Sequence, residues 1–387
     1  FYVAASVCSP SRAALLTGCY APRVGISRVL FPRDEIGLNP DETTIADILR
    51  EQGYATACIG KWHLGHHPEF LPTRHGFDSY FGIPYSNDMD GSTDEDGVRH
   101  FNVPLMRDEE IVERPAVQAT LTRRYTDEAV RFIRASGDKP FFLYLPHTMP
   151  HIPLHASEEF DGRSERGAYG DVIEEIDASV GRIMDTLVEL ALDDDTLVIF
   201  TSDNGPWLSK KEDSGTALPL RDGKFSAYEG GMRVPCVMRW PGVIPPNSTC
   251  SQPASTIDFL PTLAGVAGAS PPEDVVIDGR DILPLISGKS DTAPHDAIYY
   301  YRGERLAAVR EGDWKLHLAW TRRPNSDEPE SVPAELYDLR ADVAESRNVA
   351  MGRPDIVERL AGIAATFDTS LKADARPPGR LAPSPGE

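Results

Sequence analysis

Three stretches of this chain repeat one order of structure, an amphipathic helix followed by a short apolar strand, and this repetition constrains the fold most. The stretches cover residues 39–60, 118–145 and 172–201. In each of them, apolar side chains recur at helical spacing and an apolar run follows. Alternation of this kind predicts an α/β fold with a mostly parallel central sheet flanked by helices. The helical stripes are Ile45, Ile48 and Leu49; Leu121, Tyr125, Ala129, Phe132 and Ile133; and Val172, Ile176, Val180, Ile183, Leu187 and Leu190.

The strand of the third unit indicates where a ligand would bind. Residues 197–200 are apolar without alternation, which is typical of a central strand covered on both faces. Asp203, Asn204 and Gly205 follow directly and would emerge at the carboxyl edge of the sheet. Open α/β sheets bind their ligands at this edge, so a site is expected there.

The pattern divides the chain into a large catalytic domain and a smaller C-terminal one. We predict the α/β domain over residues 1–289 and a small antiparallel-sheet subdomain over residues 290–372, with a helix near 354–366. The Pro- and Gly-rich segment 373–387 reads as a disordered tail. Residues 86–114 are charged and weakly periodic, and we expect a long loop that covers the cleft.

Charge and cysteine content exclude some function classes. A formal net charge of -21 without a long basic stripe argues against nucleic acid as a partner. No apolar run approaches the roughly 18 residues of a transmembrane helix. The odd count of five cysteines, with no zinc-like spacing, leaves the redox compartment open.

Residues 8–18, CSPSRAALLTG, hold the most informative pattern. Cys-x-Pro-x-Arg leads into a helix-forming run, and Pro10 suits the first helical turn. Cys8 would then lie at a helix N-terminus, where free N–H groups and the helix dipole stabilise an anionic nucleophile. The five-residue pattern alone is equally compatible with a buried structural cysteine.

Over all eleven residues, this segment resembles the signature of the type I sulfatases, in the arylsulfatase- and N-acetylgalactosamine-6-sulfatase-like branch of the alkaline phosphatase superfamily. The resemblance implies that Cys8 is oxidised to formylglycine by a formylglycine-generating or anaerobic sulfatase-maturating enzyme, and it places Arg12 in the catalytic set. One hydroxyl of the aldehyde hydrate would attack sulfur and the other would later expel sulfate. A serine ester has no such internal route of breakdown.

A second cluster, GKWHLG at residues 60–65, places Lys61 and His63 two apart at a strand end, so both side chains point the same way. Alone, this spacing is more typical of a solvated strand end. The string resembles the second sulfatase signature, which implies that Lys61 binds a sulfate oxygen and that His63 is the base that opens the intermediate. Ser86 in GIPYSND resembles a substrate-binding hydroxyl of the sulfate pocket.

Two further segments resemble parts of the family's sulfate pocket. In LPHTMPHIPLH, the resemblance implies that His151 protonates the leaving oxygen or binds sulfate, with His147 as the runner-up. Without the other motifs, loop histidines of this kind are usually without function. The segment LRDGKFSAYEGGMRVP resembles one in which the lysine before the EGG turn, here Lys224, contacts sulfate and stabilises the leaving oxygen.

Asp203 and Asn204 in TSDNGP offer hard oxygen ligands for Ca²⁺ or Mg²⁺, although Asp-Asn-Gly alone is more often a turn. The resemblance implies that both residues bind a divalent cation together with the modified Cys8. The family also carries an acidic pair on a first strand ahead of the cysteine, and no such pair precedes Cys8. The chain opens FYVAAS without Met, so we expect upstream sequence to supply that strand, the remaining ligands and any export signal.

Together the motifs, in family order, predict a sulfuric ester hydrolase that acts on aryl sulfates or sulfated sugars. The resemblance implies a periplasmic, secreted or lysosome-like location. A phosphonate monoester or phosphodiester hydrolase of the same superfamily is an alternative, and an inactive homologue that binds sulfated glycans is another. A pure binder would not need both a nucleophile and its base, which argues against the last.

Overall fold

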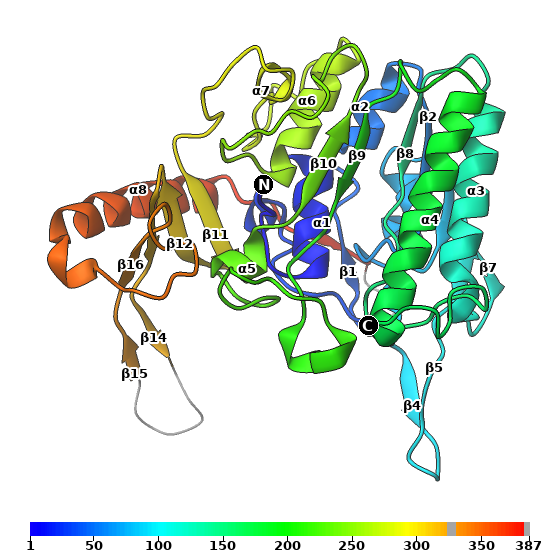
Figure 1. The fold of residues 1–387 in the computed structure, drawn as a ribbon, viewed down its shortest axis with the longest axis horizontal. Helices are drawn as coiled ribbons and strands as arrows, with labels where there is room; N and C mark the ends of the chain where they lie inside the picture. The colour runs from blue at the N-terminus through cyan, green and yellow to red at the C-terminus, as the bar shows by residue number, and fades with distance from the viewer. Residues whose placement is uncertain (323–329, 383–387) are drawn as a thin grey trace.

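A five-stranded mixed sheet lies at the centre of the computed structural model, which describes residues 1–322 and 330–382 (Figure 1). The strand order is β7-β6-β3-β2-β8. β2 runs parallel to both β3 and β8, whereas β6 and β7 extend one edge as an antiparallel hairpin. The predicted α/β class is therefore confirmed. The strands are β2 (Ala55–Ile59), β3 (Ser79–Gly82), β6 (Leu105–Arg107), β7 (Glu110–Glu113) and β8 (Phe141–Tyr144).

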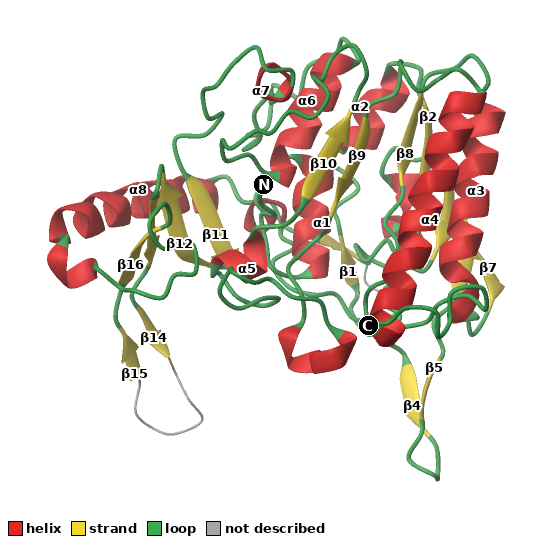
Figure 2. Cartoon of the chain, viewed as in Figure 1, coloured by secondary structure: helices red, strands yellow, loops and turns green. Residues whose placement is uncertain are grey.

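Helices cover both faces of this sheet (Figure 2). Alternate residues of β2 point to opposite sides, as the strand period requires. Cys58 packs in a core cluster with Ala13 of α1, whereas Ala57 packs with Leu121 and Tyr125 of α3. Burial of both faces explains why β2 is apolar apart from Thr56, whose hydroxyl donates to the Gly76 carbonyl. Apart from the four-residue α5 (Glu229–Met232), the helices before residue 290 are α1 (Cys8–Thr17), α2 (Ile45–Glu51), α3 (Leu121–Ser136), α4 (Gly167–Glu189), α6 (Phe259–Val266) and α7 (Leu283–Ile286).

The three helical stripes of the sequence form α2, α3 and α4, as predicted. Local signals set their ends. The Thr44 side chain accepts from the Asp47 N–H, and Asp47 in turn accepts from the Thr44 N–H, which makes a capping box at the start of α2. Gly137, with a φ of 56°, ends α3 in a conformation that favours glycine.

The strand after α4 differs from its prediction as a buried central strand. β9 (Val198–Thr201) pairs only with β10 (Cys236–Arg239) among the described strands. One face of this pair packs on the cluster of α2 and α6 through Ile199. The other face is open, and Phe200 is 44% exposed, because nothing in the described part of the chain covers it.

Residues 86–114 were expected to form a loop, and this expectation is wrong. They contain the hairpin of β4 (Gly91–Thr93) and β5 (Arg99–Phe101) and then the β6–β7 edge of the main sheet. The β4–β5 hairpin projects away from the body of the molecule (Figure 1). Both faces of the hairpin are exposed, so its sequence lacks the alternation of apolar and polar residues that would have predicted strands.

The predicted C-terminal sheet is present, with strand order β11-β12-β13-β16 and antiparallel pairing throughout. Its strands are β11 (Ile298–Arg302), β12 (Arg305–Glu311), β13 (Trp314–His317) and β16 (Glu335–Asp338). The helix α8 (Pro354–Ala373) packs on it through Ile356 and Leu360, as expected. A second hairpin pairs β14 (Trp320–Arg322) with β15 (Glu330–Val332). The domain boundary near residue 290 stays a prediction.

Part of the segment predicted to be a disordered tail is ordered. β17 (Gly379–Arg380) pairs with β1 (Ile36–Gly37), and the Arg376 guanidinium lies 2.7 Å from a Glu42 carboxylate oxygen. Residues 383–387 lie outside the described residues. Within the described ranges, no helix is long and apolar enough to cross a membrane. Short 3₁₀ turns lie at Ala21–Val24, Pro68–Phe70, Pro72–Arg74, Gln118–Thr120, Leu208–Asp213, Thr256–Asp258 and Ala350–Gly352, and α5 spans Glu229–Met232.

Candidate active site

The loops that follow β2, β3 and β8 interlock at the carboxyl edge of the central sheet. The Lys61 N–H donates to the Pro146 carbonyl at 2.8 Å, and the Trp62 N–H donates to the Ile83 carbonyl at 3.0 Å. Gly60 makes this approach possible, since a Cβ there would lie 2.1 Å from the Pro146 oxygen. The predicted motifs after β2 and β8 therefore reach one place.

Cys8 is the first residue of α1, and Val7 is the extended N-cap before it. Its side chain is buried at 3% exposure, and the Lys224 ammonium lies 3.6 Å from its sulfur. Burial alone would raise the pKa of the thiol. The charges of Lys61 and Lys224, with smaller contributions from the neighbouring side chains of His151 and His63, outweigh burial and hold the pKa of Cys8 well below its ordinary value. The site thus stabilises a negative charge at this position.

Lys61, Ser86 and His151 form one hydrogen-bonded row. The Lys61 ammonium donates to the Ser86 hydroxyl at 3.0 Å, and the Ser86 oxygen lies 3.4 Å from His151 Nδ1. His151 Nδ1 also lies 2.7 Å from the Ile152 carbonyl. Lys61 is 1% exposed, and burial lowers its pKa. The three groups together could bind an anion through hydrogen bonds, one of them from a charged ammonium.

The geometry of His63 fixes its tautomer. Its Nε2 lies 2.9 Å from the Leu30 carbonyl, which can only accept, so Nε2 carries the proton. Burial lowers the pKa of the ring to about 4, so it is neutral at pH 7. Nδ1 is buried with no hydrogen-bond partner among the described residues. A basic nitrogen is thereby left free beside Cys8, and the backbone holds it in place with a positive φ of 65°.

Arg12 connects three of the motifs. Its Nε and one terminal nitrogen donate to Asp203 Oδ2 at 3.1 and 2.8 Å, and its other terminal nitrogen donates to the Lys61 carbonyl at 2.5 Å. Its pKa is raised because the Asp203 carboxylate outweighs the opposing effect of burial. One guanidinium therefore fixes the turn after β9 against the loop after β2.

Asp203 and Asn204 fit a hard cation by their donor chemistry. Asn204 Oδ1 is buried without a hydrogen-bond partner among the described residues, and such an oxygen suits a metal ion. Both hydrogen bonds from Arg12 to Asp203 are accepted by Oδ2. In the described ranges no group of three His, Cys, Asp or Glu side chains converges as a metal cage. Asp203 and Asn204 would thus be part of a cation site.

Lys224 reaches Cys8 from a tight turn. Its N–H donates to the Pro206 carbonyl at 2.8 Å, and the next N–H, of Phe225, donates to the Ser6 carbonyl at 3.1 Å. The Lys224 ammonium lies 4.7 Å from the centre of the Trp207 ring, a cation–π contact. These bonds join the turn to the segments on both sides of the site.

The structure brings Cys8, Arg12, Lys61, His63, Ser86, His151, Asp203 and Lys224 together, and it separates His147 from them. His147 is buried beside the Tyr125 ring, and its Nε2 lies 3.4 Å from the Ser179 hydroxyl. Burial lowers the pKa of His147 to about 4. It therefore faces α3 and α4, whereas His151 faces Cys8.

Sequence reasoning missed two residues of this site. Asn87 donates to the carbonyls of His151 and Pro153 at 3.3 and 3.1 Å, and so fixes the histidine loop. The Trp207 ring lies beside His151, with ring centres 5.8 Å apart and planes tilted by 55°. The position of Asn87 directly after Ser86 was the one available signal, and Trp207 had none beyond its place after the Asp-Asn-Gly turn.

Comparison with known proteins decides the family. A model of the sulfatase family matches residues 1–269. The chain belongs to the sulfatase family. A second model, described as N-sulphoglucosamine sulphohydrolase, C-terminal, matches residues 221–364. The resemblance seen in the sulfatase motifs is thereby confirmed.

Individual sulfatases are similar over most of the chain. The N-acetylgalactosamine-6-sulfatase of Canis lupus familiaris is 42% identical over 342 residues, which cover 83% of this chain and 64% of that protein. Arylsulfatase A of Homo sapiens is 38% identical, with 93% and 78% covered. The solved structure of Ps i-CgsB with k-i-k-neocarrahexaose has a TM-score of 0.82 at 29% identity, with 98% and 85% covered. The chain spans about 64% of the length of the N-acetylgalactosamine-6-sulfatases it matches.

Proposed function

We propose that this chain carries the catalytic centre of a sulfuric ester hydrolase that uses a formylglycine made from Cys8. The observation that supports this best is the position of Cys8, buried at the start of a helix with the Lys224 ammonium 3.6 Å from its sulfur. Lys61, His63 and His151 also act on its charge. A structural cysteine has no need of two lysines, whereas a nucleophile that reacts with an anion does.

In this proposal, the chain's cationic groups bind the sulfate ester. Lys61 and Lys224 neutralise the sulfate oxygens from two sides, and Ser86 and His151 donate hydrogen bonds to them. These donors are fixed before the substrate arrives, because Lys61 is held by Ser86 and Asn87 holds the loop of His151. Preorganised donors of this kind lower the barrier because they need not rearrange during the reaction.

Formylglycine hydrate supplies two hydroxyls on one carbon, one to attack sulfur and one to release sulfate with return of the aldehyde. The Asp203 carboxylate, fixed by Arg12, takes the proton of the attacking hydroxyl. As the bond from sulfur to the leaving oxygen breaks, His151 or Lys224 protonates that oxygen. His63 Nδ1 then takes the proton of the second hydroxyl, which its fixed neutral tautomer allows.

A divalent cation, Ca²⁺ or Mg²⁺, held by Asp203, Asn204 and residue 8, would add charge stabilisation at the sulfate. The names of the similar proteins point to sulfated sugars and aryl sulfates as substrate classes. A maturating enzyme that oxidises Cys8 and a periplasmic, secreted or lysosome-like location belong to the same proposal.

Steady-state kinetics on a matched pair, an aryl sulfate and the corresponding aryl phosphonate monoester, test the reaction class. We expect the matured protein to prefer the sulfate, and Cys8→Ala to abolish its hydrolysis. Arg163→Ala, which removes an exposed arginine 4.0 Å from Glu174, is the control and should leave both rates unchanged. A strong preference for the phosphonate would make the chain a phosphonate hydrolase instead.

A further inference from the structure

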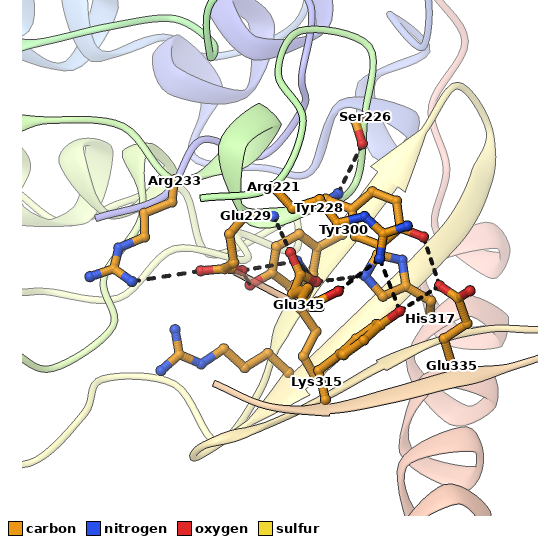
Figure 3. Close-up of polar contacts among 12 residues, drawn as sticks. Arg221, Ser226, Tyr228, Glu229, Arg233, Tyr300, Lys315, His317, Glu335 and Glu345 are labelled. Atoms are coloured by element: carbon orange, nitrogen blue, oxygen red, sulfur yellow. Dashed lines mark hydrogen bonds and ion pairs between the residues drawn. The ribbon is translucent and has the colours of Figure 1, made fainter. Parts of the chain in front are cut away.

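A cluster of charged side chains is buried around Glu229, which lies five residues after Lys224 in the chain (Figure 3). We call it the Lys315 cluster, and it consists of Lys315, Glu229, Glu345 and His317. The first three are fully buried at 0% exposure, and His317 is 13% exposed. The Lys315 ammonium lies 2.9 Å from Glu229 Oε1 and 3.1 Å from Glu345 Oε1. None of these residues touches Cys8, so the proposed chemistry does not explain why they are charged.

The cluster is well supplied with hydrogen bonds. Glu229 also accepts from the hydroxyls of Tyr2 and Tyr300, at 2.6 and 3.1 Å. His317 Nε2 lies 2.8 Å from Glu345 Oε1. Burial would raise the pKa of Glu229, but Lys315, the Tyr2 hydroxyl and Arg310 lower it to about 2, so the carboxylate is charged. Buried ion pairs often add little net stability, which favours a role in fixing one geometry.

The backbone of the Lys224 segment is bonded directly to Glu345. The Glu229 N–H donates to Glu345 Oε2 at 2.6 Å, and the Arg221 guanidinium donates to the Glu345 carbonyl at 2.7 Å. The Gly230 N–H donates to the Arg221 carbonyl at 2.9 Å and closes the segment into a loop. Lys224 lies within this loop. Both ends of the loop are thereby held by one residue of the C-terminal region.

Two further contacts strengthen this link. Arg221 also donates to the Tyr337 hydroxyl of β16 at 3.1 Å and lies over the Tyr228 ring at 3.8 Å. Glu345 itself has a positive φ of 50°, which is uncommon for a residue with a side chain and persists only where surrounding bonds hold it. The C-terminal family model matches residues 221–364, so it begins at Arg221 and takes in both the Lys224 loop and the sheet.

We propose that Arg221, Glu345 and Lys315 are positioning residues that hold the Lys224 ammonium against residue 8, so that the C-terminal sheet sets part of the active-site charge. The inference rests on the proposed function for its catalytic meaning, but the position of Lys224 can be measured without turnover. A lysine side chain has four flexible bonds, so its ammonium stays at 3.6 Å from Cys8 only if its backbone is fixed.

The unmodified protein provides the test, because the Cys8 thiol senses the nearby positive charge. Thiolate absorbance at 240 nm is followed against pH, and the Cys8→Ala titration in the same background is subtracted. We expect Arg221→Ala and Glu345→Gln to raise the pKa of Cys8 in the same direction as Lys224→Met does. Arg340→Ala is the matched control, since Arg340 is 81% exposed, pairs with Asp313 and lies on the same subdomain. It should leave the titration unchanged.

In the matured protein, Arg221→Ala should lower kcat about tenfold, the equivalent of one lost charged hydrogen bond, with a smaller change in KM. Arg221→Lys, which keeps the charge and one donor, should recover part of the loss. The proposal is overturned if folded Arg221→Ala leaves the Cys8 titration equal to the parent while Lys224→Met shifts it. It is also overturned if Lys224→Met causes no shift. Arg221 is exposed, so this variant decides the question even where Glu345→Gln fails to fold.

Discussion

Replacement of Arg12 by alanine tests whether this side chain holds the site together. The Arg12 side chain is 7% exposed, and its partner Asp203 is 27% exposed. Removal of one member of a buried pair costs about 3–5 kcal/mol, and water that reaches Asp203 places this pair at the lower end, about 3 kcal/mol. The Lys61 carbonyl also loses its donor, which adds about 1 kcal/mol. We therefore expect Arg12→Ala to lower the free energy of unfolding by about 4 kcal/mol.

Calorimetry of the purified protein measures this effect as a change in Tm. A chain of 387 residues has an unfolding entropy of about 0.8 kcal/mol per kelvin, so about 4 kcal/mol corresponds to about 5 °C. Arg12→Lys keeps the positive charge but loses the several N–H donors of the guanidinium, so its Tm should lie between those of the parent and of Arg12→Ala. The control Arg163→Ala removes a contact of 4.0 Å at 58% exposure and should shift Tm by less than about 1 °C. If Arg12→Ala melts within about 1 °C of the parent, Arg12 does not connect the motifs energetically.

Three more results are expected. Lys315 and its neighbours lower the pKa of Glu229 to about 2, from 4.5, so this carboxylate contributes about 3 kcal/mol of stability above pH 4.5 that is lost as the pH falls toward 2. In urea unfolding at pH 5, 4 and 3, the free energy of unfolding should therefore decline less with falling pH for Glu229→Gln than for the parent. An equal decline in the two proteins would contradict the assignment. Gly205→Ala places a Cβ 1.8 Å from the Gly230 carbonyl oxygen, so it should lower the free energy of unfolding by about 2 kcal/mol and abolish most of the activity. The control Gly181→Ala in α4 meets open space and should raise the free energy of unfolding by about 0.5–1 kcal/mol. Similar Tm values for the two variants would refute the clash. Chelation of divalent cations should lower Tm in the parent but less in Asn204→Ala, and an unchanged parent Tm would remove Asn204 from the cation site.

Local signals in the sequence predicted the helices well. The stripe of α3 and the glycine after it are properties of one segment, and α3 ends where Gly137 indicates. The sulfatase motifs also predicted residues that lie close together, since the structure brings Cys8, Lys61 and Lys224 to one place. Strand ends of a parallel sheet share one edge, so the placement of Lys61 after β2 follows from topology once the fold class is known.

Features that depend on distant partners could not be predicted. Lys315 and Glu345 read as ordinary surface charges, and nothing local shows that they meet Glu229, which is 86 residues from Lys315. The open face of β9 has the same cause, because an apolar run does not show how many neighbours will cover it. The β4–β5 hairpin has too few buried side chains to leave a periodic pattern.

The dependence of turnover on the state of residue 8 tests the central claim most directly. Samples matured to different extents would be analysed by peptide mass spectrometry for the fraction of Cys8 present as aldehyde, and assayed in parallel for hydrolysis of an aryl sulfate. We predict that kcat rises in proportion to the aldehyde fraction and extrapolates to zero for the pure thiol. Equal turnover by fully unmodified protein would contradict the account.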